Sequence, residues 1–208
     1  MEPEIKKSTK KTRKGHVAAI ILFLWLIYTV VYTLHLDDSL STALEFIPGI
    51  LGIITLLVAG FSPRECYLYF QAISRRGILL LSAFSLLLIP ILLSGQWTGW
   101  NWLSGLLYAP ASGISQELFF RVSLLTIFTR TFRAKPFLAV FLQAVFFAIW
   151  HMPLVFTEAP LTGAIAVSVV TFIGGLAWGY QVQHDKTVYW AMTQHIIYLM
   201  AMSLFTWD

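Results

Sequence analysis

Seven apolar stretches follow one another along the chain, and a short polar or charged connection separates each from the next. They cover residues 17–34, 43–61, 78–94, 105–128, 136–155, 161–181 and 187–206. Since an α-helix rises about 1.5 Å per residue, each stretch is long enough to cross roughly 30 Å of hydrocarbon. The pattern predicts an all-α fold, a polytopic transmembrane helix bundle of about seven spans.

The composition agrees with a chain that is surrounded by lipid. Hydrophobic residues make up 58% of the 208 residues and charged residues only 12%, whereas soluble globular domains have about 25% charged residues. We therefore expect residues 17–208 to form a single transmembrane domain without a soluble domain. Cys66 is the one cysteine, so no intrachain disulfide and no redox chemistry are expected.

The distribution of positive charge predicts the orientation of the bundle. Residues 1–16 are basic and lack an apolar run, which is typical of a solvated tail beside an anionic leaflet rather than a folded element. The connections after the second, fourth and sixth stretches carry Lys or Arg, and the alternate connections carry none. The positive-inside rule then places the N-terminus in the cytoplasm. The compact size and short loops favour a prokaryotic plasma membrane.

A charged pair interrupts the fourth apolar stretch. Glu117 and Arg121 are four residues apart, which places them on one face of a helix. A charge at the centre of a membrane helix costs about 2.5 to 3.5 kcal/mol and is retained where it faces a partner or a wet cavity. The pair is therefore either a structural ion pair or part of a functional site.

Two histidines also lie within apolar stretches, His151 in the fifth and His195 in the seventh. A single membrane histidine is usually a hydrogen-bonded core residue. If both converge with Glu117, however, the three groups can activate a water, with the glutamate as general base and the imidazoles as oxyanion donors or proton carriers. The same trio can bind zinc, although the sequence does not require it.

Several other classes of protein are not expected. The His-Glu-x-x-His pattern of zincin proteases and the glycine-rich phosphate-binding loop are both absent from the sequence, so no nucleotide is expected. Nothing beyond the basic tail suggests nucleic acid. The expected partners are membrane lipids and a membrane-tethered peptide or protein substrate.

Three segments resemble the CPBP family of membrane proteins, which includes CAAX-type prenyl protein endopeptidases and bacteriocin-processing or bacteriocin-immunity relatives. That family carries Glu-Glu-x-x-x-Arg, then Phe-x-x-x-His, then His-x-x-x-Asn or Asp, on separate helices. The matching segments, within a core at residues 105–204, run from Gln116 to Arg121, from Phe147 to His151 and from His195 to Leu199.

The resemblance implies a glutamate-dependent peptide hydrolase within the bilayer, with metal assistance left open. It would act near the C-terminus of prenylated or otherwise membrane-tethered substrates. In this chain Glu117 would be the base, His151 and His195 would be oxyanion or metal groups, and Arg121 would be the charge partner of Glu117.

Two departures from the family pattern leave alternatives open. Gln116 stands where the family has its first glutamate, and an amide cannot act as a general base near neutral pH. Leu199 stands where the family has Asn or Asp. A catalytically silent relative that acts as a binding or bacteriocin-immunity protein is therefore the main alternative. A small transporter or proton relay is a third hypothesis.

Overall fold

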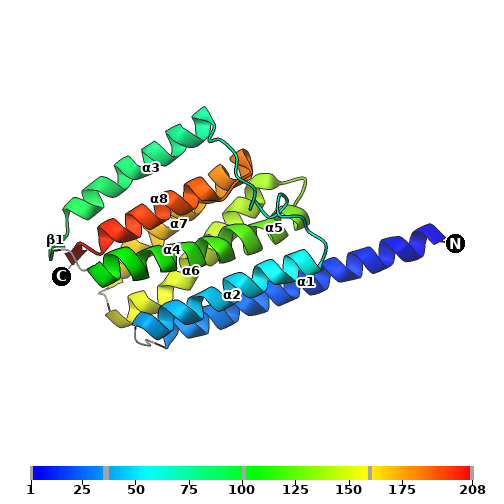
Figure 1. Ribbon diagram of the computed structural model, residues 1–208, viewed down its shortest axis with the longest axis horizontal. Helices are drawn as coiled ribbons and strands as arrows, with labels where there is room; N and C mark the ends of the chain where they lie inside the picture. The colour runs from blue at the N-terminus through cyan, green and yellow to red at the C-terminus, as the bar shows by residue number, and fades with distance from the viewer. Residues whose placement is uncertain (1, 35–37, 100–101, 159–160, 207–208) are drawn as a thin grey trace.

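The protein is a bundle of helices whose axes are roughly aligned (Figure 1). The computed structural model describes residues 2–34, 38–99, 102–158 and 161–206. Its α-helices are α1 (Glu2–Thr33), α2 (Asp38–Val58), α3 (Arg75–Leu93), α4 (Ala109–Glu117), α5 (Leu125–Thr131), α6 (Pro136–Glu158), α7 (Leu161–Asp185) and α8 (Tyr189–Met202). A π-helical segment, η1 (Ser104–Tyr108), precedes α4, and a second, η2 (Leu118–Leu124), joins α4 to α5, so that residues 104–131 form one helical run.

The all-α prediction is confirmed. The seven apolar stretches correspond to seven helical segments in the predicted order, with the fourth stretch in the run from η1 to α5. The only strands among the described residues are β1 (Gln96–Trp97) and β2 (Phe205–Thr206), which pair antiparallel. They close one end of the bundle by joining the chain after α3 to the chain after α8.

The predicted number of membrane crossings is not confirmed. Within the described residues, two helical segments are long and apolar enough to cross a membrane, Gly15–Thr33 and Ile165–Asp185, and shorter apolar segments occur at Ala43–Val58 and Pro136–Met152. The fourth helical run contains the charged pair, and α8 has 14 residues, which corresponds to only about 21 Å of helix.

The basic segment 1–16, expected to be a solvated tail, contributes residues 2–16 to a helix, and its role as a cytoplasmic tail stays a prediction. Helix α1 begins at Glu2 and continues without a break to Thr33. Lys and Arg are good helix formers, and the apolar helix that follows provides the nucleus on which more turns can be added. Figure 1 shows the N-terminal half of α1 projecting beyond the other helices.

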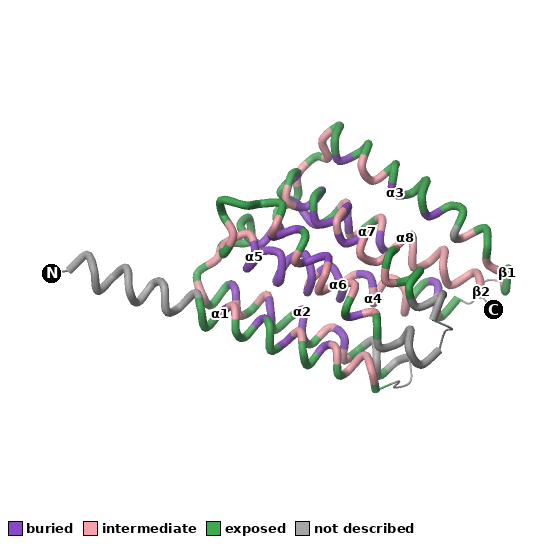
Figure 2. The backbone as a smooth tube through the Cα atoms, turned by 180° about the vertical axis from the view of Figure 1, so that it is seen from behind, coloured by how far each residue is buried: buried purple, intermediate pink, exposed green. Residues whose placement is uncertain are grey.

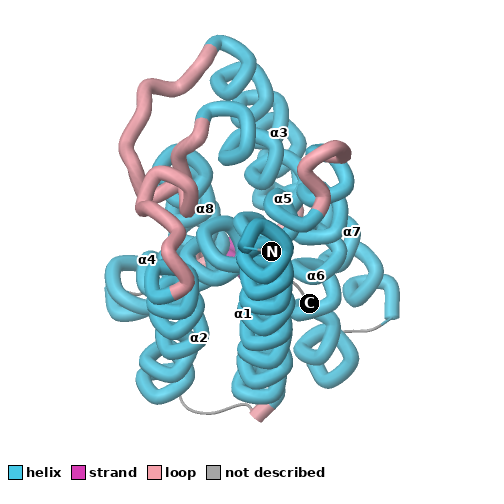
Figure 3. The backbone as a smooth tube through the Cα atoms, turned by 90° about the vertical axis from the view of Figure 1, so that its right-hand side faces the viewer, coloured by secondary structure: helices cyan, strands magenta, loops and turns pink. Residues whose placement is uncertain are grey.

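The middle part of the helical run, residues 113–128, lies inside the bundle. Viewed along the bundle, α1 and α2 lie side by side on one face and α3 lies at the opposite edge (Figure 3). Buried positions gather on α5 and its neighbours, whereas α3 is largely exposed (Figure 2). Phe23 of α1 and Leu79 of α3 are 61% and 70% exposed, and such outward apolar side chains suit contact with lipid.

Helices α6 and α7 pack closely because glycines of α7 face α6. A Cβ atom added at Gly175 would lie 2.9 Å from both Cα and Cβ of Ala144. A Cβ atom added at Gly179 would lie 2.6 Å from the side chain of Gln143. Small residues one turn apart allow two membrane helices to approach each other closely. This contact fixes the position of α6, which carries His151.

The three basic connections meet at one end of the bundle. Arg130 of α5 forms an ion pair with Glu65 of the α2–α3 connection. The Val188 N–H, just before α8, donates to the Tyr67 carbonyl at 3.0 Å. The two ends of the chain lie at opposite ends of the bundle (Figure 1). The connections that carry Lys and Arg therefore lie at one end of the bundle, and the connections without them lie at the other. The cytoplasmic location of the basic end stays a prediction.

Candidate active site

The charged pair lies where α4 changes into η2. Glu117 is the last residue of α4, and Arg121 lies in the π-helical turn that follows. The N–H of Leu125 donates to the carbonyl of Phe120, five residues earlier. A π-helical turn inside an α-helix shifts the direction of the side chains around it and is frequent at functional sites.

The structure brings three of the predicted site residues together. Nδ1 of His195 lies 2.8 Å from Oε1 of Glu117, and NH1 of Arg121 lies 3.2 Å from the same oxygen. The side chains of Glu117 and Arg121 are fully buried, and His195 is 2% exposed. A carboxylate, a guanidinium and an imidazole therefore share one buried contact between the η2 region and α8.

The Arg121 guanidinium lies among aromatic rings. Its Cζ atom is 4.2 Å from the centre of the Phe147 ring and 5.1 Å from that of Trp178. Apart from the ion-pair contact with Glu117, its Nε, NH1 and NH2 atoms have no hydrogen-bond partner among the described residues. Buried donors without a partner cost free energy, so these N–H groups are suited to bind an incoming acceptor.

The hydrogen bonds of the two histidines define their tautomers. An ionised Glu117 can only accept a hydrogen bond, so Nδ1 of His195 carries the proton and Nε2 keeps its lone pair. Nδ1 of His151 lies 2.8 Å from the carbonyl oxygen of Phe147, which also can only accept. His151 therefore has the same tautomer, with a lone pair on Nε2.

His151 lies beside the trio without a hydrogen bond to it in the described structure. The Phe147 ring touches both imidazoles, with ring centres 4.6 Å from His151 and 5.9 Å from His195. Three of the four predicted residues, Arg121, His151 and His195, thus lie around the Phe147 ring, which gives this motif residue a packing role in the site.

The site residues do not form a ligand set for zinc. No group of three or more His, Cys, Asp and Glu side chains among the described residues is placed to hold a metal ion. Oε1 of Glu117 already contacts His195 and Arg121, whereas the Nε2 atoms of both histidines keep their lone pairs. No step through a metal is derived from this arrangement.

The two departures from the motif have structural consequences. Nε2 of Gln116 donates to Oγ of Ser112 at 2.9 Å, and its Oε1 is buried without a partner among the described atoms. Among the described residues, no hydrogen bond joins Gln116 to either imidazole. Leu199 is half-buried on α8, so an apolar side chain follows one turn after His195.

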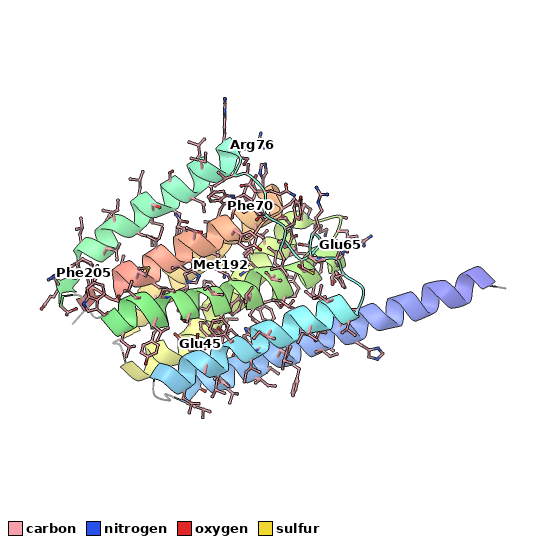
Figure 4. The ribbon with its side chains drawn as sticks, in the orientation of Figure 1. Glu45, Glu65, Phe70, Arg76, Met192 and Phe205 are labelled. Atoms are coloured by element: carbon pink, nitrogen blue, oxygen red, sulfur yellow. The ribbon has the colours of Figure 1, made fainter. Side chains whose placement is uncertain are left out.

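A second buried carboxylate was missed by the sequence analysis. Glu45 of α2 is 5% exposed, and its Oε2 accepts hydrogen bonds from Ser112 at 2.9 Å and from Ser115 at 3.2 Å. Figure 4 shows Glu45 between α2 and α4. The signal was an acidic residue inside the stretch 43–61, but it lies close to the start of that stretch, where a charge is unremarkable.

The comparisons with known proteins identify the family. The family model for Rce1-like type II CAAX prenyl endopeptidases matches residues 98–201, half of the chain, and this range includes all four predicted site residues. No curated protein and no solved structure matches the chain. Rce1-like proteins are membrane-embedded proteins of the peptide hydrolase class, and the resemblance predicted from the three motifs is confirmed. This chain belongs to the Rce1-like family of type II CAAX prenyl endopeptidases.

Proposed function

We propose that this protein is an intramembrane peptide hydrolase that cleaves membrane-tethered peptides beside a prenylated cysteine. The observation that carries the proposal is the buried hydrogen bond between Glu117 and His195, with Arg121 against the same carboxylate. The family supports the substrate class, because a CAAX sequence is a C-terminal Cys followed by three residues in which the Cys is prenylated. Short loops and a compact bundle support a prokaryotic plasma membrane as its location.

His195 is the general base in this mechanism. Its Nδ1–H donates to Glu117, so Nε2 can take a proton from water as the water oxygen attacks the scissile carbonyl carbon. Glu117 remains ionised, holds the ring in this tautomer and stabilises the imidazolium, as a buried carboxylate does in a Ser-His-Asp triad. The reaction therefore depends on Glu117 although the proton goes to His195, which differs from the base role expected from the sequence.

Arg121 stabilises the negative charge that develops on the carbonyl oxygen. Its Nε and NH2 atoms have no hydrogen-bond partner among the described residues, so an oxyanion can accept from them while NH1 stays against Glu117. When the tetrahedral intermediate collapses, the C–N bond breaks and His195 returns its proton to the leaving amine. Nε2 of His151 can accept a hydrogen bond from a substrate N–H and so orient the peptide.

The aromatic surroundings strengthen these interactions. Phe119, Phe120 and Trp150 are fully buried, and the ring of Trp178 stacks on His195 with a centre distance of 4.3 Å. Charges interact more strongly in such a region of low polarity than in water. A buried site also limits the water that reaches the reacting bond.

A catalytically silent relative, acting as a binding or bacteriocin-immunity protein, is the second candidate. Gln116 lacks basicity, and Leu199 leaves His195 without a polar neighbour one turn away. This candidate predicts that the bundle forms and binds its partner while peptides stay intact.

Product analysis with a lipidated peptide tests the proposal. The purified protein in liposomes is given a peptide that ends in a farnesylated Cys and three further residues, and mass spectrometry follows release of the tripeptide. We expect release by the wild type and at least about 100-fold slower release by H195A.

Two controls define the result. H184A alters a histidine that bonds Asp185 at the end of α7, outside the site, and should release the tripeptide at the wild-type rate. The same peptide without the farnesyl group should be cleaved more slowly. Absence of release by the wild type contradicts the hydrolase and favours the silent relative.

A further inference from the structure

Glu45 is a second carboxylate that contacts the same helix as the candidate active site. It belongs to α2, and its Oε2 accepts from two hydroxyls of α4, those of Ser112 and Ser115. Its side chain lies between the two helices (Figure 4) and is 5% exposed. An acidic side chain buried in a membrane bundle is costly, and such residues commonly serve function.

Ser112 connects Glu45 to Gln116. The Ser112 hydroxyl has a single hydrogen, and the carboxylate of Glu45 takes it at 2.9 Å. Ser112 can then only accept from Gln116, and Nε2 of Gln116 lies 2.9 Å from its oxygen. The charge of Glu45 therefore fixes which end of the Gln116 amide faces Ser112.

The other hydroxyl bound to Glu45 leads away from Gln116. Ser115 lies 3.2 Å from Oε2 of Glu45 and 2.9 Å from the Ser112 carbonyl, and its oxygen is 3.2 Å from the hydroxyl of Tyr28. Ser115 and Ser112 thus share Glu45, but only Ser112 touches Gln116. This difference provides a matched control within one network.

These hydrogen bonds, from Glu45 through Ser112 to Gln116, form a relay that leaves a buried acceptor on the residue before Glu117. With Nε2 of Gln116 bound to Ser112, Oε1 of Gln116 is buried and has no partner among the described residues. Oε2 of the adjacent Glu117 is in the same condition. Each of these oxygens can accept a hydrogen bond from an N–H or O–H donor, such as a water or a peptide bond.

We propose that Glu45 is a positioning residue of this site, which acts through Ser112 to hold the Gln116 carbonyl oxygen ready to accept a hydrogen bond from the attacking water or the substrate backbone. This inference rests on the proposed function. The Gln116 amide oxygen can accept a hydrogen bond although it cannot take a proton near neutral pH. Proton transfer is therefore the task of His195. In a purely structural role Glu45 would only join α2 to α4, and its two serine partners would be equivalent.

The test compares E45L, S112A and S115A in two measurements. The first is the kcat/KM for an internally quenched peptide that ends in a farnesylated Cys and three residues. The second is the position of the Gln116 side-chain amide signals in ¹H–¹⁵N spectra of the protein in detergent micelles, assigned by their loss in Q116L. Thermal unfolding of each variant identifies any that do not fold. If E45L does not fold, S112A, the mildest change, still tests the relay.

The relay predicts that E45L and S112A shift the Gln116 signals and lower kcat/KM by roughly tenfold each, the usual effect of losing one buried hydrogen bond. The double variant E45L/S112A should be no slower than E45L, because both changes break one relay. S115A should leave both the signals and kcat/KM close to wild type.

Three results overturn the role of Glu45 without contradicting the proposed function. Gln116 signals that do not move in E45L and S112A show that the relay does not orient the amide. Equal losses in S112A and S115A indicate a structural role. Wild-type rates in E45L and S112A, while E117Q is inactive, overturn the role of Glu45 but leave the hydrolase intact. A wild-type protein that leaves the peptide uncut instead contradicts the proposed function, and the role of Glu45 in it.

Discussion

His195 and Glu117 are 78 positions apart in the chain, and their side chains meet at 2.8 Å between Nδ1 and Oε1. This contact joins α8 to the end of α4 in the interior of the bundle. It also places a proton acceptor, Nε2 of His195, in a region where Arg121 supplies positive charge. Stability and chemistry therefore depend on the same group of buried side chains, and variants can separate the two.

Removing the Glu117 charge should destabilise the bundle. E117Q leaves the fully buried Arg121 without its counter-ion, and an unpaired buried charge costs about 3 to 5 kcal/mol. Unfolding in detergent by heat or by added sodium dodecyl sulfate measures the change. The control is E65Q, because the ion pair of Glu65 with Arg130 is partly exposed and such pairs contribute less than about 1 kcal/mol. Equal losses of stability in E117Q and E65Q would contradict the larger contribution assigned to the buried pair of Glu117 and Arg121.

Removing both charges should separate folding from chemistry. In E117L/R121M the ion pair is replaced by apolar side chains of similar size, which is often neutral or stabilising for a buried pair. We expect unfolding within about 2 kcal/mol of wild type together with complete loss of peptide cleavage. A folded double variant that cleaves at the wild-type rate would show that the pair has only a structural role.

The packing of α7 against α6 should be sensitive to a single methyl group at Gly175. A Cβ atom there would lie 2.9 Å from the Cα of Ala144, so the two backbones must separate. G175A should lower the free energy of unfolding by about 1 to 3 kcal/mol, the usual cost of overpacking. G15A in α1 is the matched control, because nothing lies within 4 Å of its added Cβ, and it should be neutral or slightly stabilising.

The single cysteine should be unreactive in the folded protein. Cys66 lies in the α2–α3 connection with no exposed surface, and burial raises the pKa of its thiol to about 11. The thiolate is the reactive form, so at pH 8 only about 0.1% of the thiol is ionised for such a pKa. A maleimide reagent should label Cys66 only after unfolding, whereas S62C, at an exposed position of the same connection, should be labelled at once. Rapid labelling of the wild type would contradict the burial.

The sequence predicts the helices well because their signal is local. The apolar stretches define the helical segments, and the four-residue spacing of Glu117 and Arg121 already indicates a shared face. The number of crossings is harder to predict, since α8 is shorter than its apolar stretch and the charged pair interrupts the fourth helical run. The basic start of α1 was expected to be a solvated tail because it lacks an apolar run, but Lys and Arg are good helix formers and the segment is helical.

The site could be predicted only in part, because the remaining contacts join distant segments. The motifs indicate His151 and His195, but the bond from His195 to Glu117 depends on how α8 packs against the α4–η2 junction. The relay from Glu45 crosses from α2 to α4, and no spacing in the sequence relates Glu45 to Ser112. The π-helical turn at η2 also has no clear local signal, although it determines the directions of the side chains that follow Glu117.

The most direct test of the central claim is the kcat/KM of wild type, E117Q, H195Q and E117Q/H195Q for the farnesylated quenched peptide. If Glu117 acts by orienting His195, each single variant should lose at least about 100-fold, and the double variant should be no slower than H195Q, since residues that act as a unit are not additive. An E117Q protein that is folded and cleaves the peptide at the wild-type rate would contradict the account.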